Sequence, residues 1–79
     1  MKIPRGVSAR EITRALEADG FVHIRTEGSH KRYRHPDGRF VTVSSHKDSD
    51  TFTIKTLRSM ILRQAHWTED DLRRLKLIK

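Results

Sequence analysis

Apolar residues near the start of the chain recur with the period of a helix. The face they form consists of Ile12, Ala15 and Leu16. Ser8 and Glu11 have the spacing of a capping box, which predicts that this helix begins at Ala9. Gly20 is the residue expected to end it, because glycine readily adopts the left-handed conformation found after a helix. We therefore expect one amphipathic helix before Gly20.

After Gly20 the period of the pattern changes to two residues, which is typical of strands. The three segments with this alternation are FVHIRTE, HKRYRH and FVTVS. Gly28 separates the first two segments. Between the second and third, Pro36 suits the second position of a tight turn and Gly38 supplies a positive φ. The pattern predicts an antiparallel meander of three strands.

The second half of the chain returns to the helical period after a polar loop, SSHKDSDT. Thr53 is the expected cap of a helix whose apolar face would be Ile54, Leu57, Met60, Ile61 and Ala65. Thr68 and Asp71 imitate a capping box and predict a last, short helix. We predict an α+β, two-layer fold in the order helix, strand, strand, strand, helix. Residues 1–79 would form a single domain, with residues 67–79 as a short helical extension.

Strand alternation also predicts which side chains face the helices and which face water. Those expected to face the helices are Val22, Ile24, Tyr33, Val41 and Val43. Those expected on the open face are His23, Arg25, His30, Arg32, Arg34, Thr42 and Ser44. Phe40 falls on the open side by the same count, either as a strand-end residue or as a stacking surface.

The net charge of the chain indicates which kind of partner the protein binds. Seventeen Lys and Arg residues against ten Asp and Glu residues give a net charge of +7. This balance favours an anionic partner such as nucleic acid, and its sign also fits a membrane surface. No apolar run approaches the roughly 20 residues of a membrane-spanning helix, and the start of the chain lacks the apolar centre of a signal peptide, so we expect a cytoplasmic protein. Without cysteine, thiolate zinc sites and thiol nucleophiles are excluded.

The row formed by His30, Arg32 and Arg34 suggests chemistry on a polyanion. An open sheet face also needs polar side chains for solubility, but acidic residues would serve that need equally well. An imidazole can transfer protons at neutral pH, so His30 is the candidate base that removes a proton from the 2′-hydroxyl of RNA. The cations expected to offset charge on the phosphoryl group are Lys31, Arg32 and Arg34. His46 is the first candidate for the acid that protonates the leaving oxygen, and His35 is the second.

Metal-dependent hydrolysis is the competing chemistry. His46, Asp48 and Asp50 could hold a cation, but no acidic residue on a neighbouring strand is expected to complete an octahedral site. We therefore expect neither a metal nor a cofactor.

The ordered motifs resemble a known family. GSHKRYRHPDGRFVTVSSH followed by TLRSMILRQA is similar to the HicA family of small mRNA interferase toxins. The resemblance implies a double-stranded-RNA-binding-like fold, metal-independent cleavage of mRNA, arrest of translation and neutralisation by a HicB antitoxin. It maps the catalytic histidine onto His30 and a later histidine onto His46. The residues expected to contact RNA are Arg25, Ser29, Lys31, Arg32 and Arg34.

Two other functions remain open on the sequence. The same fold and charge would suffice for an RNA-binding module without catalysis. A basic face could also exist only to meet an acidic antitoxin. We expect the free protein to be monomeric, since no apolar stripe remains once the core is assigned.

Overall fold

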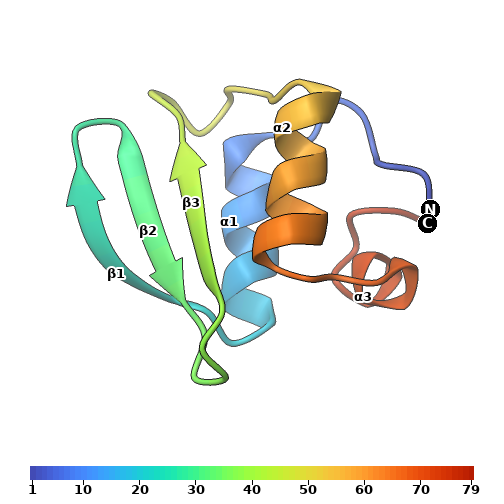
Figure 1. The fold of residues 1–79 in the computed structure, drawn as a ribbon. Helices are drawn as coiled ribbons and strands as arrows, with labels where there is room; N and C mark the ends of the chain where they lie inside the picture. Colours follow the sequence, from blue (N-terminus) through green and yellow to red (C-terminus); the bar gives the residue numbers. More distant parts are fainter.

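The computed structural model describes residues 1–79 and has an α+β fold (Figure 1). Its elements are α1 (Ala9–Ala18), β1 (Val22–Glu27), β2 (His30–Arg34), β3 (Phe40–Ser44), α2 (Ile54–Arg58), η1 (Ser59–Gln64) and α3 (Glu69–Arg74). The three strands form an antiparallel sheet in the order β1-β2-β3. The expected order of elements is confirmed. No helix in the structure has the length and apolar character needed to cross a membrane.

Local signals define the ends of the helices. The Ser8 hydroxyl accepts the Glu11 N–H at 3.2 Å, while the Glu11 carboxylate accepts the Ser8 N–H at 3.1 Å. Thr68 and Asp71 form the same reciprocal pair at the start of α3. Because each pair satisfies two backbone donors that a helix leaves unpaired, both capping boxes begin helices as the sequence predicts.

The core lies between β2, β3 and the helices. Tyr33, Val41 and Val43 are the buried residues of the sheet. Residues of the C-terminal segment are equally buried, with Leu72 fully buried and Leu75 and Leu77 nearly so. The segment after residue 67 therefore belongs to the same core as the sheet.

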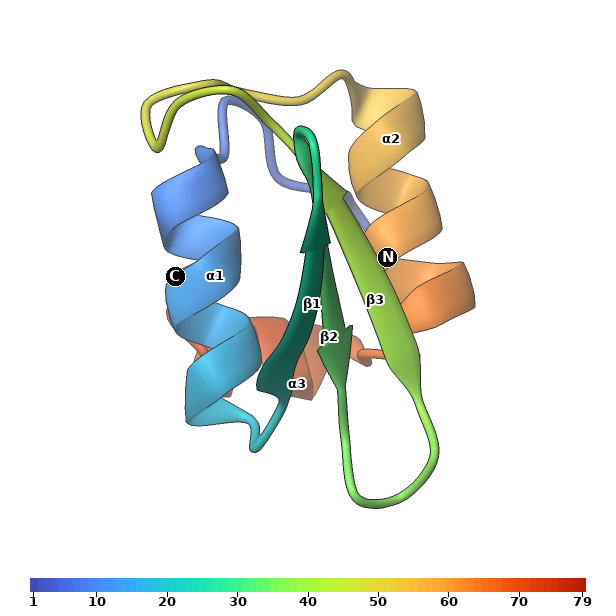
Figure 2. The ribbon, with the colours of Figure 1, turned by 90° about the vertical axis from the view of Figure 1, so that its left-hand side faces the viewer.

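β1 departs from the simple alternation. Val22 and Ile24, expected to face the helices, are 58% and 50% exposed. The pairing with β2 shifts between His23 and Arg25, so Ile24 forms a bulge that breaks the count of two. β1 is also the strand farthest from the helices, and seen from its side α1 and α2 lie behind it to the left and right (Figures 1 and 2).

Because of this bulge, the predicted faces of two β1 residues, Val22 and His23, are wrong. Val22 pairs with Arg34 and so shares the open face with it, whereas His23 pairs with Tyr33 and shares the opposite face. The His23 and Tyr33 rings lie 5.2 Å apart. Regular alternation placed these two β1 residues the other way round.

The second long helix is not regular throughout. After Arg58 it widens into the π-helical turn η1, and the Ala65 N–H donates to the Met60 carbonyl at 2.8 Å. In this turn the Gln64 side chain accepts the Thr42 N–H at 2.9 Å. Gln64 thus satisfies a backbone donor of the edge strand β3.

The polar loop between β3 and α2 is bonded to α1. The Asp50 and Asp48 carbonyls accept the N–H groups of Ala9 and Arg10 at 2.8 and 3.0 Å. The Asp50 carboxylate accepts the N–H groups of His46 and Lys47, and these bonds lower its pKa. The loop that carries His46 is therefore fixed by its own backbone bonds and by those to α1.

Candidate nucleic-acid interface

Register places the open-face side chains in three rows across the strands. Directly paired residues share a face of the sheet. From one end of the sheet to the other, the rows are Val22, Arg34 and Phe40; Arg25, Arg32 and Thr42; Glu27, His30 and Ser44. The structure thus puts His30, Arg32 and Arg34 on one face, where alternation along the second strand predicts them.

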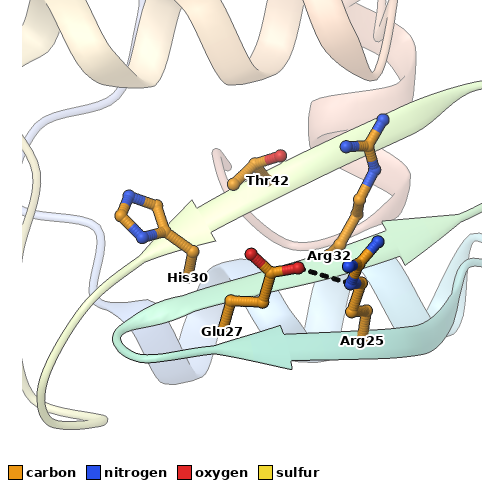
Figure 3. Close-up of a pocket in the computed structure, with 5 residues that line it drawn as sticks. All are labelled: Arg25, Glu27, His30, Arg32 and Thr42. Atoms are coloured by element: carbon orange, nitrogen blue, oxygen red, sulfur yellow. Dashed lines mark ion pairs between the residues drawn. The ribbon is translucent and has the colours of Figure 1, made fainter.

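His30 lies in a hollow at one end of this face (Figure 3). The residues that line the hollow are Arg25, Glu27, His30, Arg32 and Thr42. Its volume is about 100 Å³, well below the roughly 300–1,000 Å³ of small-molecule pockets. A hollow of this size holds a single chemical group but not a whole small molecule.

Glu27 is the residue of this hollow that the sequence analysis overlooked. Its carboxylate binds the Arg25 side chain, with Arg25 Nε 2.5 Å from Glu27 Oε1. It is also the direct cross-strand partner of His30, because the two-residue turn Gly28–Ser29 joins their strands. Alternation counted from Arg25 places Glu27 on the open face, so the signal was present in the sequence.

His46 lies in a different hollow from His30. The residues around it are Gly28, Ser29, Lys31, Ser45, His46, Lys47 and Asp48. The two hollows occur at the same end of the sheet, since the Ser45 N–H donates to the Ser29 carbonyl at 3.0 Å and Ser44 pairs with His30. The structure therefore groups the candidates Ser29 and Lys31 with His46, and the candidates Arg25 and Arg32 with His30.

Arg34 lies at the other end of the open face, beside Phe40. The Arg34 and Arg32 guanidinium carbons are 5.7 and 4.8 Å from the centre of the Phe40 ring. Both distances fall within the range of a cation–π interaction. Phe40 itself is 40% exposed.

His35, the second candidate for the acid, has both ring nitrogens in use within the turn. Its Nε2 lies 2.9 Å from the Asp19 carbonyl oxygen, and its Nδ1 accepts the Asp37 N–H at 3.1 Å. Its ring packs against Phe21. These contacts place His35 in the β2–β3 turn and outside both hollows.

The acidic residues of the β3–α2 loop have partners of their own. Asp50 binds backbone N–H groups, and Asp48 lies 3.9 Å from the Arg10 guanidinium. The structure brings together no group of three or more His, Cys, Asp or Glu residues that could hold a metal ion.

Comparison with known proteins identifies one family. The model of the family described as HicA toxin of bacterial toxin-antitoxin matches residues 9–67, well over half of the chain. No curated protein matches the chain. The matched residues include all three strands and both hollows.

Proposed function

The chain belongs to the HicA toxin family of bacterial toxin–antitoxin systems, and from this premise we propose that it is a metal-independent endoribonuclease that cleaves mRNA in the cytoplasm. The observation that carries the proposal is the position of His30 in a hollow with Arg25 and Arg32. Cleavage of a phosphodiester by its own 2′-hydroxyl requires a proton-transfer group and cations that offset the charge on the phosphoryl oxygens.

The proposed reaction follows from this arrangement. His30 takes the proton of the ribose 2′-hydroxyl, and the 2′-oxygen attacks the adjacent phosphorus. The bond from phosphorus to the 5′-oxygen breaks, leaving a 2′,3′-cyclic phosphate on one fragment and a 5′-hydroxyl on the other. Arg25 and Arg32 offset the negative charge that grows on the phosphoryl oxygens. DNA lacks the attacking hydroxyl, so the reaction is specific for RNA.

His46 is the proposed donor of a proton to the leaving 5′-oxygen. In an in-line displacement the attacking and leaving oxygens lie on opposite sides of phosphorus. We assign this role to His46 because Ser44, the cross-strand partner of His30, lies two residues before His46, so both histidines are at the same end of the sheet. Ser29 and Lys31, which line the His46 hollow, would contact the RNA there.

Glu27 is a positioning residue in this scheme. Its ion pair with Arg25 holds that guanidinium beside the hollow. Its carboxylate also lies across from His30 in the register, where its charge balances the imidazolium that forms during the reaction.

The antitoxin partner follows from the family, and we propose that it is HicB-like and inhibits by covering the open face. That face carries Arg25, Arg32 and Arg34 against one carboxylate, Glu27. An acidic segment laid over these residues would exclude RNA by occupancy alone.

The test compares the wild-type protein with His30→Ala on RNA in the presence of a chelator. We expect the wild type to produce 2′,3′-cyclic phosphate ends and the variant to lose about 100-fold or more in rate. Lys2→Gln, at the terminus and away from the sheet, serves as the matched control. Equal cleavage by His30→Ala would contradict the proposal. RNA binding without cleavage by the wild type would support the non-catalytic module instead.

A further inference from the structure

Phe40 is an unusual residue for an open, charged sheet face. Of the five Phe, Tyr and Trp residues in the chain, it alone is exposed, at 40%. Its cross-strand neighbours in the same row are Arg34 and Val22, and Val22 is itself 58% exposed. The catalytic scheme uses none of these three side chains for proton transfer.

The surroundings of Phe40 have the composition of a base-stacking surface. Two guanidinium groups, from Arg32 and Arg34, lie over its ring at 4.8 and 5.7 Å. Aromatic rings and arginine planes are the groups on which proteins stack the bases of single-stranded nucleic acid. The same arginines can turn toward phosphates, which would uncover the ring for a base.

The distance from Phe40 to the His30 hollow can be expressed in nucleotides. Phe40 pairs with Arg34, four residues along β2 from His30, which corresponds to about 14 Å at roughly 3.4 Å per residue. Same-face neighbours along the strand are thus about 7 Å apart, comparable with neighbouring phosphates of an extended nucleic-acid strand. Phe40 therefore lies about two nucleotides from a phosphate held beside His30.

We propose that the Phe40 ring, when Arg32 and Arg34 turn from it toward phosphates, is a nucleobase-stacking subsite that binds single-stranded RNA two nucleotides from the cleaved linkage. This subsite rests on the ribonuclease function proposed above and adds that the substrate is single-stranded RNA. Bases within a double helix are already stacked on their neighbours, so this subsite selects unpaired RNA. It tolerates any base, because every base presents a π-face.

Cleavage of substrates of two lengths tests the subsite. Phe40→Leu keeps an apolar side chain but removes the ring, and Phe40→Trp restores a ring. On a single-stranded oligonucleotide we expect Phe40→Leu to lower kcat/KM by about five- to a hundredfold and Phe40→Trp to retain activity. On a dinucleotide, which cannot reach Phe40, both variants should match the wild type. Leu62→Ala, an equally exposed apolar residue on η1, is the matched control.

An abasic nucleotide locates the contact along the RNA. In the wild type, removing the base two positions from the cleaved linkage, on the side that reaches Phe40, should lower the rate of cleavage. The factor should equal that caused by Phe40→Leu. The abasic nucleotide should cause no further loss in that variant. An equal loss for Phe40→Leu on the dinucleotide, or no loss on either substrate, would overturn the proposal.

Binding to uncleavable RNA separates this proposal from the ribonuclease proposal. A single-stranded 2′-O-methyl oligonucleotide lacks the attacking hydroxyl, so its affinity is independent of catalysis. We expect Phe40→Leu to weaken its binding and His30→Ala to leave it nearly unchanged. Tight binding of this RNA by both the wild type and Phe40→Leu would overturn the stacking subsite even if cleavage is confirmed. If the wild type bound this RNA through Phe40 but cleaved no RNA, the stacking subsite would be supported and the ribonuclease proposal would be wrong.

Discussion

His30 lies among side chains from all three strands. Glu27 and Arg25 come from β1, Arg32 comes from the strand of His30 itself, and Thr42 comes from β3. The hairpin turn Gly28–Ser29 sets this arrangement, because a two-residue connection pairs Glu27 with His30 directly. Arg25 and Arg32 then face each other in the next row. The cations beside His30 are thus fixed by strand pairing, and a change of register would remove them.

The roles of the two histidines can be separated by the leaving group. A substrate with sulfur in place of the bridging 5′-oxygen has a leaving group that needs no acid. We expect His46→Ala to be about 100-fold slower than the wild type on the oxygen substrate and nearly equal to it on the sulfur substrate. His30→Ala should remain slow on both. If the sulfur substrate restored His30→Ala instead, His30 would be the acid and the proposed assignment would be wrong.

Asp19 joins several elements at the end of α1. Its carboxylate accepts the Trp67 indole N–H at 2.9 Å and lies 2.7 and 3.2 Å from the guanidinium groups of Arg74 and Arg39. Burial alone would raise its pKa, but the bonds from Trp67 and Arg74 and the charge of Arg39 outweigh burial and lower it. The carboxylate therefore links α1, the β2–β3 turn and α3 in its charged form.

Replacing this carboxylate should destabilise the fold in a pH-dependent way. Asp19→Asn keeps the shape but loses the charge, and we expect the free energy of unfolding to fall by about 2 kcal/mol at neutral pH. Since the pKa of Asp19 is lower in the folded state, its contribution is present above about pH 4 and is lost as the pH falls through the folded value. Urea unfolding at several pH values measures this.

The comparison variant for Asp19 is Asp70→Asn. Asp70 forms an exposed ion pair with Arg73 within α3, and such pairs contribute little. We expect its unfolding curve to match that of the wild type. A difference between wild type and Asp19→Asn that stayed constant from neutral pH to below pH 3 would contradict the role given to the charge.

Much of the fold could be predicted from the sequence because its signals are local. The capping pairs Ser8–Glu11 and Thr68–Asp71 act over three residues, and the β2–β3 turn needs only Pro36 and Gly38, whose φ is 100°. These two helix starts and this turn are thus determined by neighbours in the chain.

The features that could not be predicted depend on contacts between distant segments. The bulge at Ile24 appears only when β1 pairs with β2, and the π-helical turn places Gln64 against β3. In the candidate site, alternation along β2 was sufficient to predict that His30, Arg32 and Arg34 lie on the open face. His46 lies in a separate hollow because its loop is hydrogen-bonded to α1. The periodicity of the sequence does not predict these bonds.

The molecule as a whole separates its proposed RNA-binding face from the segment beyond the family match. The sheet lies on one side and α3 on the other, with α1 and α2 between them (Figure 1). Arg73 and Arg74 of α3 have acidic partners, whereas Arg32 and Arg34 have none. Arg32 and Arg34 of the open face can therefore bind phosphates without breaking an ion pair.

This distribution of charge predicts the salt dependence of RNA binding. Affinity for single-stranded RNA should fall as salt rises, with a log–log slope of about −0.7 for each phosphate contact. We expect Arg32→Gln to reduce the slope by about that amount, because one counterion fewer is released. Arg73→Gln, on α3, should leave it unchanged. Equal slopes for the wild type and Arg32→Gln would show that Arg32 does not contact phosphate.

If His30 activates the 2′-hydroxyl of RNA, then removing that hydroxyl from a single nucleotide should abolish cleavage at that nucleotide. The substrate is an RNA strand in which the ribose on the 5′ side of one known cleavage site lacks its hydroxyl. We expect cleavage to stop at that linkage and to continue at the neighbouring linkages, with cyclic phosphate ends. Continued cleavage at the modified linkage would contradict this role of His30.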